Sequence, residues 1–314
     1  MSRRVEPFTP RLVALDIDGT LYANVPGTGV VEELIRPRVY DAVQRAVDAG
    51  AHIVLSTGRS AFSIGSVWDQ LDLPRGDRGS RTETDGTGND GSETDGPRPE
   101  SDGPGPGADS GTGNDGTVLT VASNGSVVFS YPPVEVLSAT TFDAREIVTK
   151  LMEHVPDAAV AVEEVGVGYR LNRRFPEGEI NGAMRIEPIE DLVAEPVTRV
   201  IIRDPHSSEE EFVALAERLG LHGTNYFIGW TAWLDLAPEG VSKASALADV
   251  CDRLGVAQAD VLAIGDGRND LEMLRWAGRG VAMGQAPLEV QEAADDVTRT
   301  VDEDGVAHEL ARWF

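Results

Sequence analysis

The sequence contains a single cysteine, Cys251, and no hydrophobic run close to the length of a membrane-spanning helix. One cysteine cannot form a disulfide bond within the chain, nor can it build a cysteine-based metal cluster. A membrane-spanning helix needs about 20 consecutive apolar residues, and no segment comes near that length. The first residues, MSRRVEPFTP, carry basic charge but lack the apolar stretch of a signal peptide. We therefore expect a soluble, globular protein of the cytoplasm.

Lysine is also scarce, and acidic residues outnumber basic ones. Lys150 and Lys243 are the two lysines among 27 basic residues, whereas 53 residues are acidic, which gives a net charge of −26 and a pI near 4.4. Nucleic acids and anionic membranes repel such a chain, so neither is expected as a general partner. Acid excess with little lysine indicates a halophilic protein, because concentrated salt screens self-repulsion. A GC-rich coding bias also favours arginine over lysine, but it does not explain the acid excess.

Composition separates one segment from the rest of the 314-residue chain. Residues 75–116 contain 12 glycines and a single apolar residue, Ala108, and they repeat the short units ETDG and TGNDG. Such a segment has too little apolar surface to offset the entropy lost on folding, so we predict a disordered, acidic, glycine-rich insertion. The whole chain is 41% hydrophobic, and the part outside this segment is long enough for about two domains.

Outside this insertion, both ends of the chain alternate between strand-like and helix-like segments. The apolar run 11–17 is typical of a buried parallel strand, and 37–50 has the periodicity of a helix that begins at a proline and ends at a glycine. The further segments are strands at 52–55, 118–122, 261–264 and 280–283, and helices at 243–254 and 269–277. This alternation predicts an α/β fold whose doubly wound, Rossmann-like parallel sheet is built from residues 1–125 and 239–314.

The middle of the chain, residues 126–238, follows a different pattern. Its strand-like stretches lie at 134–140, 159–165, 168–171, 198–203 and 226–236, and its helical ones at 143–154 and 207–220. We predict an α+β domain that is inserted into the α/β core. Lys150 lies within one of these helices and is expected to be a solvated charge, whereas Cys251, on an apolar helix face of the core, is expected to be buried.

Carboxylates and small polar residues follow directly after several of the predicted core strands. They occur as DIDGT at 16–20, STGR at 56–59 and GDGRND at 265–270, and Lys243 opens the helix after the middle domain. Because the carboxyl ends of parallel strands meet at one edge of a sheet, we expect these side chains to share one crevice. Carboxylates gathered there repel one another unless a cation neutralises them. The ligands are oxygens without histidine or cysteine, which favours a hard ion such as Mg²⁺ over zinc.

A lysine and hydroxyl groups beside a metal–carboxylate cluster suit a phosphate group. Mg²⁺ and the ammonium neutralise its non-bridging oxygens, while one carboxylate can attack phosphorus to form an aspartyl-phosphate. A second carboxylate two residues further on can protonate the leaving oxygen and then activate water. Lys243 is one of two lysines in a chain whose other basic residues are arginines. We therefore expect that its position needs a compact charge and that an arginine would not fit there.

Together these motifs resemble those of the haloacid dehalogenase-like (HAD) phosphatases. DIDGT is similar to the family's DxDGT signature, STGR to its second motif, Lys243 to its third, and GDGRND to the form GDxxND of its fourth. SNG at 123–125 and APEGVSKASAL at 237–247 look like the Cof-type sugar-phosphatase branch, which carries a C2-type cap domain between the second and third motifs. The resemblance covers about 160 residues of the two core segments, with the motifs in the family's order. It implies a HAD core with an α+β cap at 126–238.

The resemblance also implies a role for each matching residue. Asp16 would be the nucleophile and Asp18 the general acid and base. Mg²⁺ would be held by Asp16, the backbone carbonyl of Asp18, and Asp266. The residues that bind the phosphoryl group would be Thr57, Gly58, Lys243 and Asn269. Those that support this site would be Thr20, Ser56 and Asp270, the last by orienting Lys243 or a metal-bound water.

The expected function is hydrolysis of a small, soluble phosphate ester, a sugar or other metabolite phosphate. Phosphatases of phosphoglycolate, mannosyl-3-phosphoglycerate or sucrose phosphate are the alternatives among enzymes, because related caps serve such acids and sugars. Outside enzymes, the alternative is a phosphate sensor or receiver-like phosphoacceptor, although such modules need no second aspartate like Asp18 and no inserted domain. Arg59 of the second motif is expected to pair with a surface carboxylate, with substrate contact as the alternative.

Overall fold

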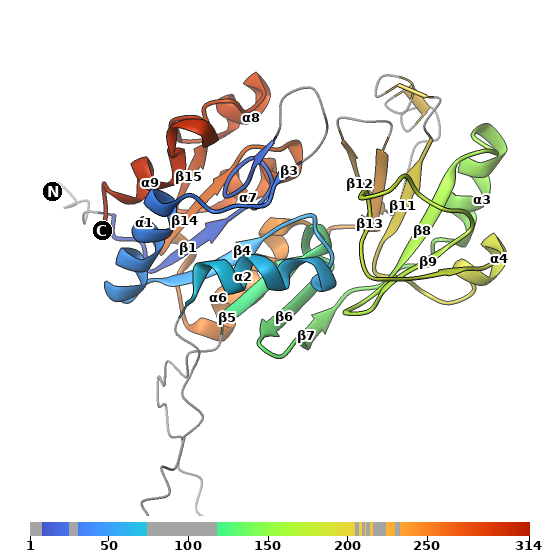
Figure 1. Cartoon of the computed structure of the whole chain (residues 1–314), viewed down its shortest axis with the longest axis horizontal. Coiled ribbons are helices and arrows are strands. Elements are labelled where there is room, and N and C mark those ends of the chain that lie inside the picture. Colours follow the sequence, from blue (N-terminus) through green and yellow to red (C-terminus); the bar gives the residue numbers. More distant parts are fainter. Residues whose placement is uncertain are drawn as a thin grey trace, which may run out of the picture. The chain divides into compact units, whose positions relative to one another are not determined.

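The computed structural model describes residues 8–24, 31–73, 118–204, 207, 208, 211, 214, 215, 224–229 and 233–314. Two large sheets and the helices packed on them make up most of this part of the chain (Figure 1). The glycine-rich insertion predicted at 75–116 and most of the helix predicted at 207–220 lie outside the described residues. The larger sheet is mainly parallel and carries helices, which confirms the predicted α/β class.

The larger sheet has eight strands in the order β16-β15-β14-β1-β4-β5-β6-β7. Its strands are β1 (Leu12–Leu15), β4 (His52–Ser56), β5 (Val118–Ala122), β6 (Val127–Tyr131), β7 (Glu135–Ala139), β14 (Val261–Gly265), β15 (Arg279–Ala282) and β16 (Asp296–Val297). Neighbouring strands from β16 to β5 are parallel, whereas β6 and β7 are antiparallel to their neighbours. The central strand β1 pairs with both β14 and β4, so Leu12 lies opposite Val261 and His52.

Helices cover both faces of this sheet because its parallel strands are apolar on both sides. Leu12 and Ala14 of β1 contribute to one apolar cluster, and Val13 and Leu15 to another. α1, α2 and α9 pack in the Val13 cluster, and α6, α7 and α8 in the Leu12 cluster. The helices are α1 (Pro37–Asp48), α2 (Gly65–Leu71), α6 (Lys243–Leu254), α7 (Leu271–Trp276), α8 (Leu288–Ala293) and α9 (Gly305–Leu310).

α6 begins at Lys243, as the sequence predicted, because Ser242 and Ser245 form a capping box. The backbone N–H of Ser245 donates to Ser242 Oγ (3.3 Å), and the backbone N–H of Ser242 donates to Ser245 Oγ (2.9 Å). Gly125 lies against the backbone of Ser242, where a Cβ would overlap the main chain, and its φ is 105°. This close approach places the first residue of α6 beside the turn that follows β5.

The second sheet has six strands in the order β10-β9-β8-β11-β13-β12. Its strands are β8 (Ala159–Glu164), β9 (Gly168–Leu171), β10 (Ala183–Ile186), β11 (Val200–Arg203), β12 (Thr224–Gly229) and β13 (Trp233–Pro238). All pairs are antiparallel except β9–β10. α3 (Arg145–His154) and α4 (Ile189–Leu192) pack on one face (Figure 1). Strand alternation directs Glu163, Arg199 and Asp235 to the other face, and all three are buried.

The predicted strand at 226–236 is wrong, because the structure has a pair of strands there. β12 and β13 pair antiparallel, with Gly229 opposite Trp233. The stretch YFIGWTAWLDL is almost continuously apolar and offers one glycine as a turn signal, so its pattern did not reveal the reversal.

The start predicted for the inserted domain, residue 126, also needs correction. β6 pairs with β5, and β7 pairs with β6, in the larger sheet, so residues 127–139 extend the core. The turn at 123–125 sends the chain straight back along β5, and an antiparallel strand of this kind has the same alternating pattern as a strand of the middle domain.

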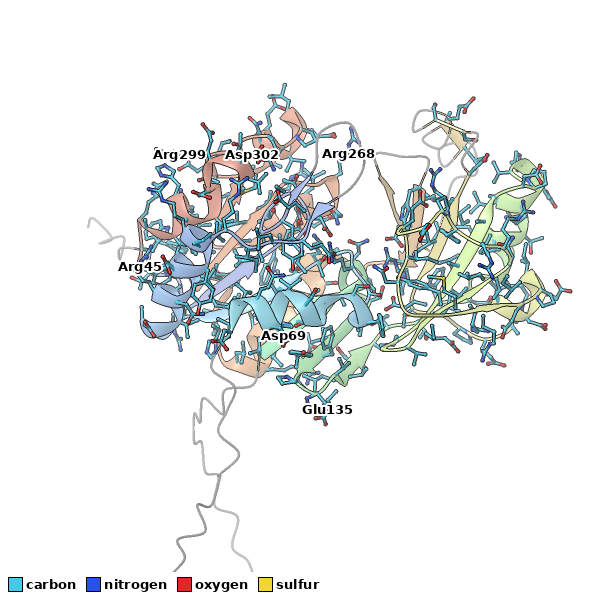
Figure 2. All side chains as sticks on the ribbon, in the orientation of Figure 1. Arg45, Asp69, Glu135, Arg268, Arg299 and Asp302 are labelled. Carbon is cyan, nitrogen blue, oxygen red and sulfur yellow. The ribbon has the colours of Figure 1, made fainter. Side chains whose placement is uncertain are left out.

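Charged side chains project from many elements, including the labelled Arg45 of α1 and Glu135 of β7 (Figure 2). Lys150 is also exposed and pairs with Glu146 one turn away (2.6 Å), which confirms it as a solvated charge. β2 (Ala23–Asn24) and β3 (Val31–Glu32) form a separate two-stranded pair. Within the described ranges, none of the helices has the length and apolar character that crossing a membrane requires.

Cys251 gives a direct test of packing around α6. It is 3% exposed, and burial, with Asp252 nearby, raises the pKa of its thiol to about 11. At pH 8 the native protein should therefore react with a thiol reagent about 100-fold more slowly than the protein unfolded in denaturant, because only thiolate is nucleophilic. The measurement is a colorimetric thiol assay in concentrated KCl, and equal rates in the two states would contradict the packing.

Candidate active site

The carboxyl ends of four neighbouring strands, β14, β1, β4 and β5, carry polar residues, and those after β14, β1 and β4 are the ones that the sequence singled out. Asp16 follows β1, Thr57 follows β4, Asn124 follows β5 and Asp266 follows β14. All four residues are buried, with exposed fractions of 8% or less. The predicted convergence of the motifs at one edge of the sheet is therefore present in the structure.

The ammonium of Lys243 lies between two carboxylates. Its Nζ donates to Asp16 Oδ1 (2.7 Å) and to Asp270 Oδ1 (2.6 Å), and its side chain is fully buried. Burial alone would lower the pKa of Lys243, but the two carboxylates outweigh it and raise the pKa above its usual value. The site therefore holds a permanent positive charge next to Asp16.

Negative charge nevertheless exceeds positive charge here. Carboxylate oxygens of Asp16, Asp266 and Asp270 lie within 4.8 Å of one another. Burial raises the pKa of Asp16 well above its usual value, and Asp270 and Asp266 add to the rise although Lys243 opposes it. Burial, followed by repulsion from Asp270, raises the pKa of Asp266 to about 7. A cation bound among these oxygens would relieve the repulsion.

Asp270 differs from the other two carboxylates because both of its oxygens are already engaged. Oδ1 accepts from Lys243, and Oδ2 accepts from the backbone N–H groups of Asp266 (2.9 Å) and Gly267 (2.8 Å). Asp270 thus holds Lys243 and the turn after β14 in place. Asp16 and Asp266 are left as the carboxylates available to a metal ion.

Asp18, the expected general acid and base, is more accessible and is held by Arg59. The Asp18 side chain is 37% exposed and accepts from Arg59 Nη2 (2.7 Å) and Nε (2.9 Å). Arg59 also donates to Glu33 (2.7 Å). The expectation that Arg59 pairs with a carboxylate is confirmed, but its main partner is a candidate catalytic residue.

The residues expected to bind a phosphoryl group also lie together. Asn269 Nδ2 donates to Asn124 Oδ1 (2.9 Å), and the backbone N–H of Asn124 donates to the carbonyl oxygen of Thr57 (3.1 Å). A Cβ placed on Gly58 would lie 3.1 Å from Asn124 Oδ1 and 3.5 Å from Asn269 Nδ2. The lack of a side chain at Gly58 therefore keeps the approach to both amides clear.

Thr20 and Ser56, expected to support the site, are both buried. Among the described residues, Thr20 Oγ1 and Ser56 Oγ have no hydrogen-bond partner. Their supporting role stays a prediction.

Sequence reasoning missed two residues at this edge. Gln285 Nε2 donates to the carbonyl oxygen of Gly19 (2.6 Å) and to Asp266 Oδ2 (3.3 Å). Asn124 joins Thr57 to Asn269 but was noted only as part of the SNG resemblance. Both residues follow the end of a core strand, β15 or β5, so the rule that found the other motifs would have found them too.

Two glycines with nearly the same φ test how closely the residues of this site are packed. Gly19 and Gly50 have φ of +85° and +86°. A Cβ on Gly19 would overlap the Asp266 carboxylate, whereas nothing lies within 4 Å of a Cβ on Gly50. Gly50→Ala should lower the free energy of unfolding by about 1 kcal/mol through backbone strain. Gly19→Ala should lower it by about 2 kcal/mol more, because Asp266 must also move.

The measurement is denaturant unfolding of both variants at one salt concentration. Equal losses would show that Asp266 has room to move away from Gly19.

A family model described as haloacid dehalogenase-like hydrolase matches residues 13–77 and 113–310. Similar proteins that align along nearly the whole chain include YcsE and YitU of Bacillus subtilis (strain 168), both named 5-amino-6-(5-phospho-D-ribitylamino)uracil phosphatase. YcsE is 25% identical over 100% of this chain and 99% of its own. YitU is 26% identical over 97% of this chain and 98% of its own.

Solved structures share the fold. BT1666 from Bacteroides thetaiotaomicron, a phosphatase of the HAD superfamily, has a TM-score of 0.69 at 23% identity and covers 100% of this chain and 98% of its own. BT4131, a sugar phosphatase of HAD subclass IIB, has a TM-score of 0.70 at 20% identity, with 96% and 98% covered. The residues matched by the family model include all four motifs, so this chain belongs to the haloacid dehalogenase-like hydrolases.

Proposed function

We propose that this chain is a Mg²⁺-dependent phosphatase that hydrolyses a small phosphomonoester, a sugar or metabolite phosphate, through an aspartyl-phosphate at Asp16. The observation that carries the proposal is the buried ammonium of Lys243 between Asp16 and Asp270, beside Asp266. One place thus offers a carboxylate nucleophile, a fixed positive charge and oxygen ligands for a hard cation. Relatives that align along the whole chain are named phosphatases.

The two halves of the reaction use Asp16 and Asp18. In the first half, the Asp16 carboxylate attacks phosphorus, the bond from phosphorus to the ester oxygen breaks, and Asp18 donates its proton to that oxygen. In the second half, Asp18 takes a proton from water as the water oxygen attacks phosphorus. The bond to Asp16 then breaks, which releases inorganic phosphate and restores both carboxyl groups to their starting forms.

The remaining residues hold the phosphoryl group in line with Asp16. Lys243 already donates to one Asp16 oxygen, and its charge attracts the phosphoryl oxygens. Thr57, Gly58 and Asn269 lie at the adjacent strand ends and supply further N–H and O–H donors. Arg59 fixes the side chain of Asp18 beside this group without entering the cluster itself.

The ligands at this site fit Mg²⁺. Asp16, Asp266 and the backbone carbonyl of Asp18 would hold the ion, and all three ligands are oxygens. Burial, and after it repulsion from Asp270, raises the pKa of Asp266 to about 7, and a divalent cation would favour the ionised carboxylate. When bound, Mg²⁺ supplies neutralisation of the charge on the phosphoryl oxygens.

The second sheet is assigned as the cap domain that selects the substrate, and the domain starts after β7 rather than at residue 126. Asp235 and Glu163 of this sheet bond to Asn124 (2.9 Å) and Ser123 (2.5 Å) of the core, so the cap contacts the phosphoryl side of the site. Cap domains of this kind exclude water and select the leaving group. Because YcsE and YitU are named for 5-amino-6-(5-phospho-D-ribitylamino)uracil, that ester is a candidate substrate beside the sugar phosphates.

A charge of −26 supports function in concentrated salt inside the cell, so salt is a variable in the test. Phosphate release is measured from a panel of sugar phosphates, phosphoglycolate, mannosyl-3-phosphoglycerate, sucrose phosphate and 5-amino-6-(5-phospho-D-ribitylamino)uracil. Each ester is run at low salt and in multimolar KCl, with Mg²⁺ and with a chelator. Turnover is expected with Mg²⁺ and is expected to be lost on chelation.

Asp16→Asn keeps the size of the side chain but removes the nucleophile. It should lower turnover by about 1000-fold or more while the protein remains folded. Full activity in this variant would contradict the role of Asp16. A folded wild-type protein that is silent on every ester in both salts would favour the phosphate sensor instead.

A further inference from the structure

Asn124 lies in the turn between β5 and β6 of the larger sheet and is held in an unusual conformation. It is 3% exposed and has φ 55° and ψ 27°, in the left-handed region that asparagine tolerates better than most residues. Its side chain bonds in two directions. Nδ2 donates to Asp235 Oδ2 on β13 (2.9 Å), and Oδ1 accepts from Asn269 Nδ2 (2.9 Å).

The Arg199–Asp235 ion pair determines which way the amide of Asn124 points. Arg199 donates to Asp235 through Nε (2.7 Å) and Nη2 (2.6 Å), and both side chains are 6% exposed. An arginine can only donate hydrogen bonds and an ionised carboxylate can only accept them. Asp235 therefore accepts from the NH₂ group of Asn124, which leaves the carbonyl oxygen of Asn124 directed at Asn269.

The orientation of the Asn124 amide also determines the orientation of the Asn269 amide. The oxygen of Asn124 can only accept, so Asn269 must direct its NH₂ group, and not its oxygen, toward it. The NH₂ group has a second N–H, which is then available to a phosphoryl oxygen. If the Asn269 amide turned over, it would present an oxygen to the phosphate, and two acceptors would face each other.

We propose that Asn124 is a positioning residue for the phosphoryl group and that the Arg199–Asp235 pair of the cap sets its orientation. Donors and acceptors alternate from Arg199 through Asp235 and Asn124 to Asn269, and they end on a donor at the phosphate. The proposal rests on the phosphatase function proposed above. It makes the inserted sheet part of the phosphate-binding machinery, in addition to any contact it makes with the leaving group.

Asp235→Asn tests the direction of these hydrogen bonds, because it hardly changes the shape of the side chain. Arg199 Nη2 and Asn124 Nδ2 both donate to Asp235 Oδ2, and Arg199 Nε donates to Oδ1, so the new NH₂ group must face at least one of these donors. Where it faces the NH₂ group of Asn124, Asn124 turns over, and Asn269 then presents its oxygen to the phosphate. The dissociation constant of inorganic phosphate, measured by calorimetry with Mg²⁺ in concentrated KCl, should rise about tenfold, and kcat/KM should fall by at least as much.

The double variant Asn124→Asp with Asp235→Asn is the decisive control. The new carboxylate at 124 accepts both from the amide at 235 and from Asn269, which restores the orientation of Asn269. Phosphate affinity should return to within about threefold of wild type, although each single variant is weakened. A purely structural role would move the unfolding midpoint without moving the phosphate dissociation constant.

Glu179→Gln is the control, because Glu179 pairs with another arginine of the same sheet. Glu179 accepts from Arg203 of β11 (3.1 Å), so the substitution also removes a carboxylate partner from a cap arginine, but it has no link to Asn124. Phosphate affinity should be unchanged. If Asp235→Asn does not fold, Asn124→Ser replaces it, because its short hydroxyl cannot bridge the two partners and the same tenfold loss is expected.

The outcomes separate the two proposals. A wild-type protein that neither binds phosphate nor hydrolyses esters would overturn the proposed function. A wild-type protein that does both, with Asp235→Asn binding phosphate equally well, or with Glu179→Gln weakened equally, would overturn the orienting role alone.

Discussion

The buried ammonium of Lys243, held between Asp16 and Asp270, is the interaction on which the site depends. Removing a lysine from water is costly unless carboxylates compensate, so these side chains must arrive at one point together. The fold meets this need by joining elements far apart in sequence. The end of β1 carries Asp16, the turn after β14 carries Asp270, and the capping box at Ser242 starts α6 with Lys243 in its first turn.

The same cluster explains why a cation belongs there. Burial raises the pKa values of Asp16 and Asp266, and repulsion from Asp270 adds to both shifts. Asp270 is itself held in place, because its second oxygen accepts from two backbone N–H groups. The site therefore has one carboxylate, Asp270, that is held by hydrogen bonds on both oxygens. The other two, Asp16 and Asp266, remain available for nucleophilic attack and metal binding.

Several parts of the fold were predictable from local pattern. α6 and β9 have the predicted bounds, because a serine cap, a following glycine and a short alternating run mark their ends. The reversal between β12 and β13 was not predictable, because the stretch around Gly229 stays apolar throughout. The membership of β6 and β7 in the core sheet was missed for a related reason. An antiparallel strand has the same period in either sheet, and its pairing partner alone decides where it belongs.

The sequence by itself determined the class of fold and the approximate site, because parallel strands bring whatever follows them to one edge of the sheet. Asp16, Thr57 and Asp266 could be placed together on that ground, and Lys243 by the resemblance of its motif. Tertiary structure decided the pairings that give each group its direction: Arg59 with Asp18, Gln285 with Asp266, and Asn124 with Asp235. The last pair is separated by 111 residues. Such contacts depend on how loops and the inserted sheet pack together in space. The periodicity of the sequence does not predict which distant residues will pack against each other.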